Sequence, residues 1–145
     1  MQAEFEPIFA SLRQLLAFHA DRFFVKSDTA SEYWLTTKGP SPFPQHKGHP
    51  LDVTWIRVGK AYVSLHLMPI YMAPQLTKNM SESLKKRMQG KTCFNFRTQP
   101  EPEILAELSS LIEESLKQWK EVATEGARQA TKLVSGRASA RSSRG

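Results

Sequence analysis

The sequence predicts an α+β fold, in which a four-stranded, mainly antiparallel sheet carries an N-terminal and a C-terminal helix on one face. Three observations lead to this prediction. Apolar residues recur at helical spacing near both ends, two β-rich runs flank a short turn in the middle, and a short aromatic strand follows them. We expect residues 1–123 to form one domain and residues 124–145 to be a basic, disordered tail.

The first helix is expected from about Glu6 to Ala20. Its apolar side chains recur every three or four residues and so share one side of the helix; they are Ile8, Phe9, Leu12, Leu15 and Leu16. The segment SEYWLTT, residues 31–37, is rich in aromatic and β-compatible residues and predicts a strand. The prolines and glycines of residues 38–50 exclude regular structure, and a loop of that length is usually functional or mobile.

A hairpin is the clearest local prediction. The runs LDVTWIRV and AYVSLHLM flank Gly59-Lys60, which suits a two-residue turn of type I′ or II′. That turn would place Val58 opposite Ala61 and Ile56 opposite Val63. Because side chains alternate, the core face receives Ile56, Val58, Ala61, Val63, Leu65 and Leu67. The opposite face receives Val53, Trp55, Arg57, Tyr62, Ser64 and His66.

A short helix, a strand and a long helix complete the predicted domain. SESLKKRMQG predicts a helix capped by Ser81, with Gly90 in the left-handed position after its end. KTCFNFR predicts a strand with Phe94 and Phe96 on the core face and Cys93, Asn95 and Arg97 on the other. After Pro100 an amphipathic helix is expected, whose apolar stripe is Ile104, Leu105, Leu108, Leu111, Ile112, Leu116 and Trp119.

Charge and composition narrow the function classes. The net charge is +6 over 145 residues, but five Lys or Arg side chains and a single Glu lie in residues 124–145. The body is therefore close to neutral, which weakens a nucleic-acid prediction based on charge alone. No apolar run approaches the ~20 residues of a membrane span. A single cysteine cannot form an internal disulfide, so we expect a cytoplasmic protein.

The mixed sheet face is the candidate site. It combines aromatic bodies with polar tips, and we expect Trp34 to join it from a neighbouring strand; its predicted members are Trp55, Arg57, Tyr62, His66, Cys93, Asn95 and Arg97. Such a face suits a small ligand or a protein partner. It also suits stacking of single-stranded nucleic acid, helped by the basic tail. The alternatives are an exposed sheet stabilised by cross-strand pairs, or a homodimer interface.

Three further motifs are weaker candidates for a functional site. Cys93 would need a base to act as a nucleophile, and His66 can project from the same face. His46 and His49 lack the third ligand that a specific metal site needs, so no metal or other cofactor is predicted. The basic run LKKRMQGK is read as a solvated helix end. The prediction is therefore a non-enzymatic binding module, either a monomer or a homodimer.

The segments KAYVSLHLMPIY, LKKRMQGKTCFNF and EILAELSSLIEESLKQW together resemble the YdhG-like family of bacterial domains. The likeness runs from about Leu51 to Trp119, and its most specific element is Gly90, Lys91, Cys93 and Phe96. The resemblance implies a compact α+β domain with an antiparallel sheet and flanking helices. Some family members are described as frataxin-like iron chaperones, so the resemblance also implies metal chaperoning as an alternative. It implies no catalytic residues.

Overall fold

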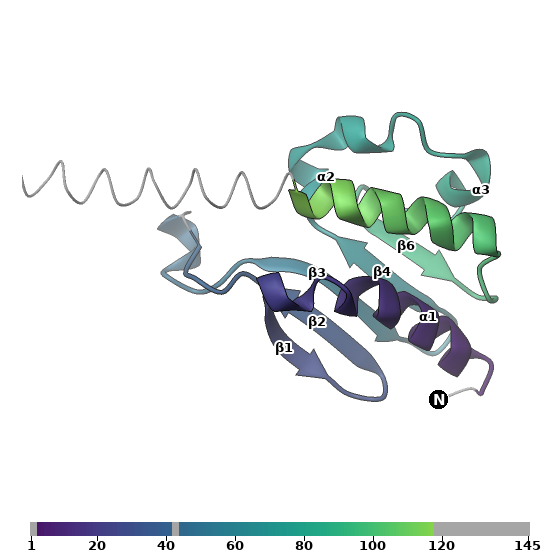
Figure 1. The fold of residues 1–145 in the computed structure, drawn as a ribbon, viewed down its shortest axis with the longest axis horizontal. Coiled ribbons are helices and arrows are strands. Elements are labelled where there is room, and N and C mark those ends of the chain that lie inside the picture. Colours follow the sequence, from purple (N-terminus) through teal and green to yellow (C-terminus); the bar gives the residue numbers. More distant parts are fainter. Residues whose placement is uncertain (1–2, 42–43, 118–145) are drawn as a thin grey trace, which may run out of the picture.

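A computed structural model describes residues 3–41 and 44–117 of the chain. Figure 1 shows its elements, which follow one another as α1 (Phe5–Ala17), η1 (Ala20–Arg22), β1 (Phe24–Asp28), β2 (Glu32–Thr36), η2 (Pro44–His46), β3 (Asp52–Val58), β4 (Val63–Leu67), α2 (Pro69–Met72), η3 (Pro74–Thr77), α3 (Glu82–Lys85), β5 (Met88–Gln89) and β6 (Cys93–Phe96). Here η marks a 3-10 helix. Residues 102–117 form a further helix. The predicted tail and Trp119 lie outside the described residues.

The α+β class and the antiparallel sheet are confirmed, but the predicted number of strands is wrong. The sheet has six strands in the order β1-β2-β3-β4-β6-β5, and every neighbouring pair is antiparallel. β1 lies at one edge and is largely exposed, so it lacks the alternation that marks a half-buried strand. β5 has only two residues, at the other edge, and had been assigned to the end of a helix.

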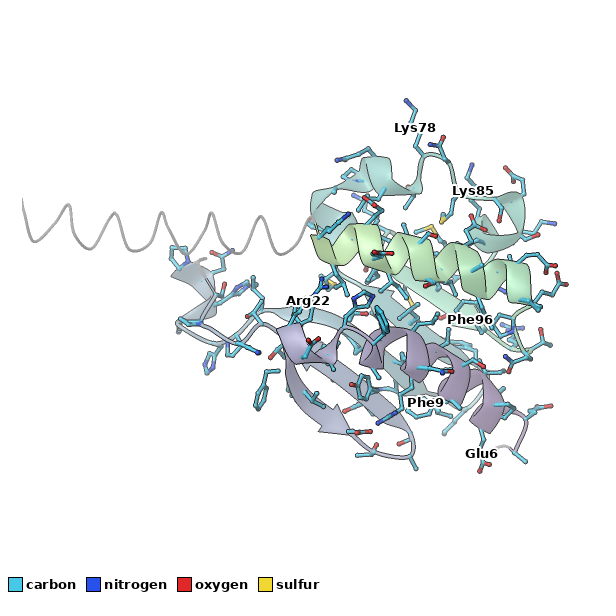
Figure 2. The ribbon with its side chains drawn as sticks, viewed as in Figure 1. Glu6, Phe9, Arg22, Lys78, Lys85 and Phe96 are labelled. Carbon is cyan, nitrogen blue, oxygen red and sulfur yellow. The ribbon has the colours of Figure 1, made fainter. Side chains whose placement is uncertain are left out.

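Both long helices cover the same face of the sheet. In Figure 1, α1 lies in front of β3 and β4, and the helix of residues 102–117 runs beside it over β6. Fully buried side chains from the two helices and the strands meet between these layers: Ile8, Leu12, Leu16, Leu35, Ile56, Leu65, Leu67, Phe94, Phe96, Leu108 and Ile112. Figure 2 labels Phe9 of α1 and Phe96 of β6. The predicted two-layer arrangement and its core are therefore present.

The register of the central hairpin differs from the prediction. Val58 pairs with Val63 and Ile56 with Leu65, so the connection is residues 59–62 and the two-residue turn is wrong. The wider loop is closed by the Gly59 N–H, which donates to the Tyr62 carbonyl at 2.9 Å. Because the shift is of two residues, the side chains of residues 55–58 and 63–67 stay on their predicted faces. Ala61, however, becomes an exposed loop residue instead of a core residue.

A β-bulge changes the start of β3. Leu35 pairs with Thr54 and Thr36 with Asp52, which leaves Val53 as an extra residue. Val53 and Thr54 are both fully buried, so the predicted position of Val53 on the opposite face is wrong. The same bulge turns Asp52 outward, where its carboxylate accepts a hydrogen bond from Trp34.

The segment between β4 and β6 combines confirmed and corrected predictions. Ser81 caps α3 by accepting from the Leu84 N–H at 3.2 Å, as predicted. The helix ends at Lys85, earlier than expected. Gly90 has the predicted left-handed conformation, with φ 76°, but in the β5–β6 turn and not at a helix end. Ser81 also donates to Glu107 at 2.6 Å, which ties α3 to the helix of residues 102–117.

His19 is the buried titratable group of the helix layer. Its side chain is 6% exposed, and its Nδ1 makes no hydrogen bond within the part of the chain that the structure describes. Burial lowers the pKa of His19, and the charge of Arg22 lowers it further, against the opposing effects of Glu113 and Asp21. The folded state therefore favours the neutral imidazole.

We expect acid to destabilise the protein through His19. Since its folded-state pKa lies below the ordinary 6.5, the unfolded chain binds more protons below that pH. The contribution to stability is complete above 6.5 and is lost as the pH falls through the folded-state pKa. The free energy of unfolding, measured with urea at about pH 7.5 and about pH 5, should fall less between these two pH values in His19→Gln than in the original chain. Equal losses would contradict this role; some dependence remains in the variant because the pKa of His66 is also lowered.

Candidate functional site

The face of the sheet opposite the two helices carries four predicted side chains in register. Trp34 of β2 pairs with Trp55 of β3, Trp55 with His66 of β4, and His66 with Cys93 of β6. We call these four residues, together with Lys26 of β1, the aromatic row, and this side of the sheet the open face. Its four predicted members are half-buried. No helix covers the open face within residues 3–41 and 44–117.

The rings of the aromatic row stack on one another across the strands. The Trp34 and Trp55 centroids are 4.6 Å apart with planes at 14°, and the Trp55 and His66 centroids are 4.7 Å apart with planes at 13°. The Nζ of Lys26 lies over the Trp34 ring, 4.5 Å from its centroid. Trp55 stacks on the same indole. These separations match the spacing of neighbouring strands, so the rings stand upright on the sheet. Their faces cover one another, and their edges point outward.

Two carboxylates are paired with cations on the open face. The indole N–H of Trp34 donates to Asp52 Oδ1 at 2.9 Å, and the Lys26 Nζ lies 3.9 Å from the same oxygen. A second row lies beside the aromatic row and consists of Glu32, Arg57, Ser64 and Asn95, paired in that order across β2, β3, β4 and β6. In this polar row, Arg57 donates from Nε and Nη2 to Glu32 Oε2 at 3.2 and 3.0 Å.

The thiol of Cys93 ends the aromatic row. Its Sγ lies 3.6 Å from His66 Nε2 and 3.4 Å from Asn95 Oδ1, to which it donates. Burial raises the pKa of the Cys93 thiol, while burial and the nearby Arg57 lower the pKa of His66. Both groups are thus favoured in their neutral forms. These shifts disfavour the thiolate, which is the form that nucleophilic catalysis by cysteine uses.

Five of the seven predicted site residues come together on the open face, and two do not. Trp34 joins them as expected, and Ser64 takes the place opposite Arg57 that had been predicted for Tyr62. Tyr62 lies in the loop of residues 59–62, half-buried. Arg97 is exposed beyond the end of β6.

Three charged residues of the open face were missed. Lys26 lies in β1, a strand that was not predicted, and Asp52 reaches the face only because of the bulge at Val53. Glu32 could have been found, since it stands two residues before Trp34 and so shares its face in the predicted strand.

The histidines of the proline-rich loop form no metal centre in the described structure. His46 Nδ1 lies 2.6 Å from Ser41 Oγ. Among the residues with described positions, no three His, Cys, Asp or Glu side chains are grouped as metal ligands. In Figure 1 the loop extends past the ends of β2 and β3. No described helix is long and apolar enough to span a membrane.

Comparisons with known proteins found no relative of the chain. No family model matches the chain, and the comparisons with curated proteins and with solved structures found no match. The resemblance to the YdhG-like family stays a prediction, and functional proposals rest on the geometry of the open face.

Proposed function

We propose that the protein is a non-enzymatic binding module that holds a partner on the open face of its sheet. The observation that carries this proposal is the uncovered aromatic row, which places two indoles and an imidazole on a face opposite both long helices. Contiguous aromatic surface of this kind is a common mark of association. The neutral Cys93–His66 pair supports binding over thiol chemistry.

Nucleic-acid binding is the alternative that the geometry favours less. Single-stranded bases stack on exposed ring faces, whereas both faces of Trp55 are occupied by Trp34 and His66. Glu32 and Asp52 offset the charges of Arg57 and Lys26, so the face offers phosphates no net positive charge. The contribution of the basic tail to such binding is a separate prediction. Nothing in the described residues favours metal chaperoning.

The proposal is tested by site-specific photo-crosslinking in living cells. A photoreactive amino acid replaces Asn95 on the open face in one variant and Glu114, exposed on the helix of residues 102–117, in the matched control. We expect a light-dependent product of defined mass from position 95 and none from position 114. Equal products from both positions, or none from position 95, would contradict a binding role for the open face.

A further inference from the structure

The positive charge of the described chain is concentrated between β4 and β6. Residues 69–91 hold five Lys or Arg side chains and one Glu, a net charge of +4. The rest of the described chain holds nine Lys or Arg against eleven Asp or Glu. Because this segment leads into the edge strand β5, we call its five cations the basic edge; they are Lys78, Lys85, Lys86, Arg87 and Lys91. Four are exposed, and Arg87 is half-buried.

The solvated helix end that the sequence predicted accounts for only part of this charge. Lys85 lies in the last turn of α3, and Arg87 donates to the Ser83 carbonyl of the same turn at 2.9 Å. Lys78 precedes the helix, however, and Lys91 lies in the β5–β6 turn. The influence of a helix dipole falls off beyond the last turn. The basic edge therefore extends past the helix end in both directions.

Two acidic side chains contact this segment and leave it positive. Glu82 lies 3.6 Å from Lys85 in an exposed ion pair, which is a weak interaction. Glu107 of the helix of residues 102–117 accepts from the backbone N–H and the hydroxyl of Ser81 at 2.7 and 2.6 Å. With both carboxylates included, the net charge is +3. The open face differs, since its two cations are each matched by a carboxylate.

An exposed aromatic ring lies beside the basic edge. Tyr71 of α2 is 61% exposed, and the Nζ of Lys91 lies 5.8 Å from its ring centroid. No described ring stacks on Tyr71, in contrast to Trp55 with its two stacked neighbours. Proteins bind single-stranded nucleic acid with this combination, in which cations hold the phosphates and an exposed ring stacks on a base.

The directions of the cations favour a flexible partner. Lys85 and Lys86 are consecutive residues with helical backbone, so their side chains diverge by about 100° around the helix axis. A flat membrane surface would meet only part of such a set, whereas a single strand can bend from one cation to the next. An acidic peptide can bend as well, but it offers no base to the ring of Tyr71.

We propose that the basic edge binds the phosphate backbone of a single-stranded nucleic acid, with Tyr71 stacking on one of its bases. The proposal uses none of the residues of the aromatic row, where the ring faces are covered. It goes beyond the proposed function and does not depend on it, so the crosslinking experiment at position 95 tests the open face separately.

The probe is a fluorescent oligothymidylate of about twelve residues, and fluorescence anisotropy follows its binding to the full chain as salt is added. For single strands, each phosphate contact contributes about −0.7 to the slope of log affinity against log salt. The double variant Lys78→Gln with Lys85→Gln should bind at least about tenfold more weakly at about 0.1 M salt, with a slope flatter by about 1.4. Figure 2 shows both lysines projecting from the α2–α3 segment.

The matched control removes two charges from the proline-rich loop. Lys38 and Lys47 are exposed there, and in Figure 1 this loop lies on the other side of the view from α3. The double variant Lys38→Gln with Lys47→Gln has the same net charge as the test variant. Because charges beyond about 10 Å are screened at this salt concentration, its affinity should stay within about twofold of the original chain.

The ring of Tyr71 is tested separately from the charges. Tyr71→Ala should weaken oligothymidylate binding by about fivefold or more, the scale of one lost stacking contact. The salt slope should not change, because a neutral ring releases no counterions. Tyr71→Phe keeps the ring and should bind like the original chain. Since all the substituted side chains are exposed, unchanged urea midpoints should show that every variant is folded.

Four results would overturn the proposal: no binding of oligothymidylate at low salt, equal effects of the two double variants, no effect of Tyr71→Ala, or tighter binding of a polyglutamate peptide or a phosphatidylserine vesicle. Unchanged binding in the Lys78 and Lys85 double variant would assign the nucleic acid to another part of the chain, such as the basic tail. The basic edge would then serve only to keep β5 from pairing with another chain.

Discussion

Replacing Phe94 by alanine is expected to lower the free energy of unfolding by about 3–5 kcal/mol. Phe94 is fully buried, and it lies between Leu65 of β4 and Met88 of β5 in the sheet. Truncation leaves a cavity under the helix layer that the neighbouring strands cannot fill without shifting. Urea unfolding, followed by far-UV circular dichroism, measures the loss.

The matched control for this core substitution is Phe18→Ala. Phe18 is 82% exposed at the end of α1, so the same truncation should change stability by less than about 0.5 kcal/mol. A similar loss in the two variants would mean that the inner face of β6 is not the core described above.

Trp55→Ala is expected to separate binding from folding. Trp55 lies at the centre of the aromatic row, and truncating a central aromatic anchor costs at least about 2 kcal/mol, or thirtyfold in affinity. Stability should fall by only about 1 kcal/mol, the scale of a lost stacking pair on a sheet surface. The measurements are the affinity for the partner captured from position 95 and the urea midpoint of the variant.

Trp55→Phe provides the control, because it keeps an aromatic ring between Trp34 and His66 and should retain most of the affinity. Should Trp55→Ala unfold the protein, Trp55 would be a core residue and the open face would lose its assignment as a surface. Unchanged affinity in a folded Trp55→Ala variant would place the partner elsewhere.

The faces of the central hairpin could be predicted because the face of a strand side chain depends only on whether its residue number is odd or even. An error of two residues in the register moved Val58 from Ala61 to Val63 but left Trp55 and His66 on one side of the sheet. The amphipathic helices were predictable for a similar reason, since a stripe such as Leu108 and Ile112 follows from spacing alone. β1 carries no such signal, because an edge strand with little buried surface needs no alternation.

The composition of the site was harder to predict than its location. Asp52 reaches Trp34 through a bulge, and no local pattern marks the extra residue at Val53. The upright stacking of Trp34 and Trp55 depends on cross-strand register and on the cation beside them, both of which are tertiary properties. The sequence therefore identified most of the aromatic residues of the face, but not that their ring faces would be hidden.

The strand order has a consequence for the newly made chain. Except for β4 and β6, all neighbouring strands in the sheet are consecutive in sequence, so most of the sheet can assemble from local hairpins as the ribosome releases it. α1 is available early, but the helix over β6 is made after every strand. Until residues 102–117 emerge, Phe94 and Phe96 have no cover on that side. During this interval a nascent chain would be prone to aggregation and a natural client for a chaperone.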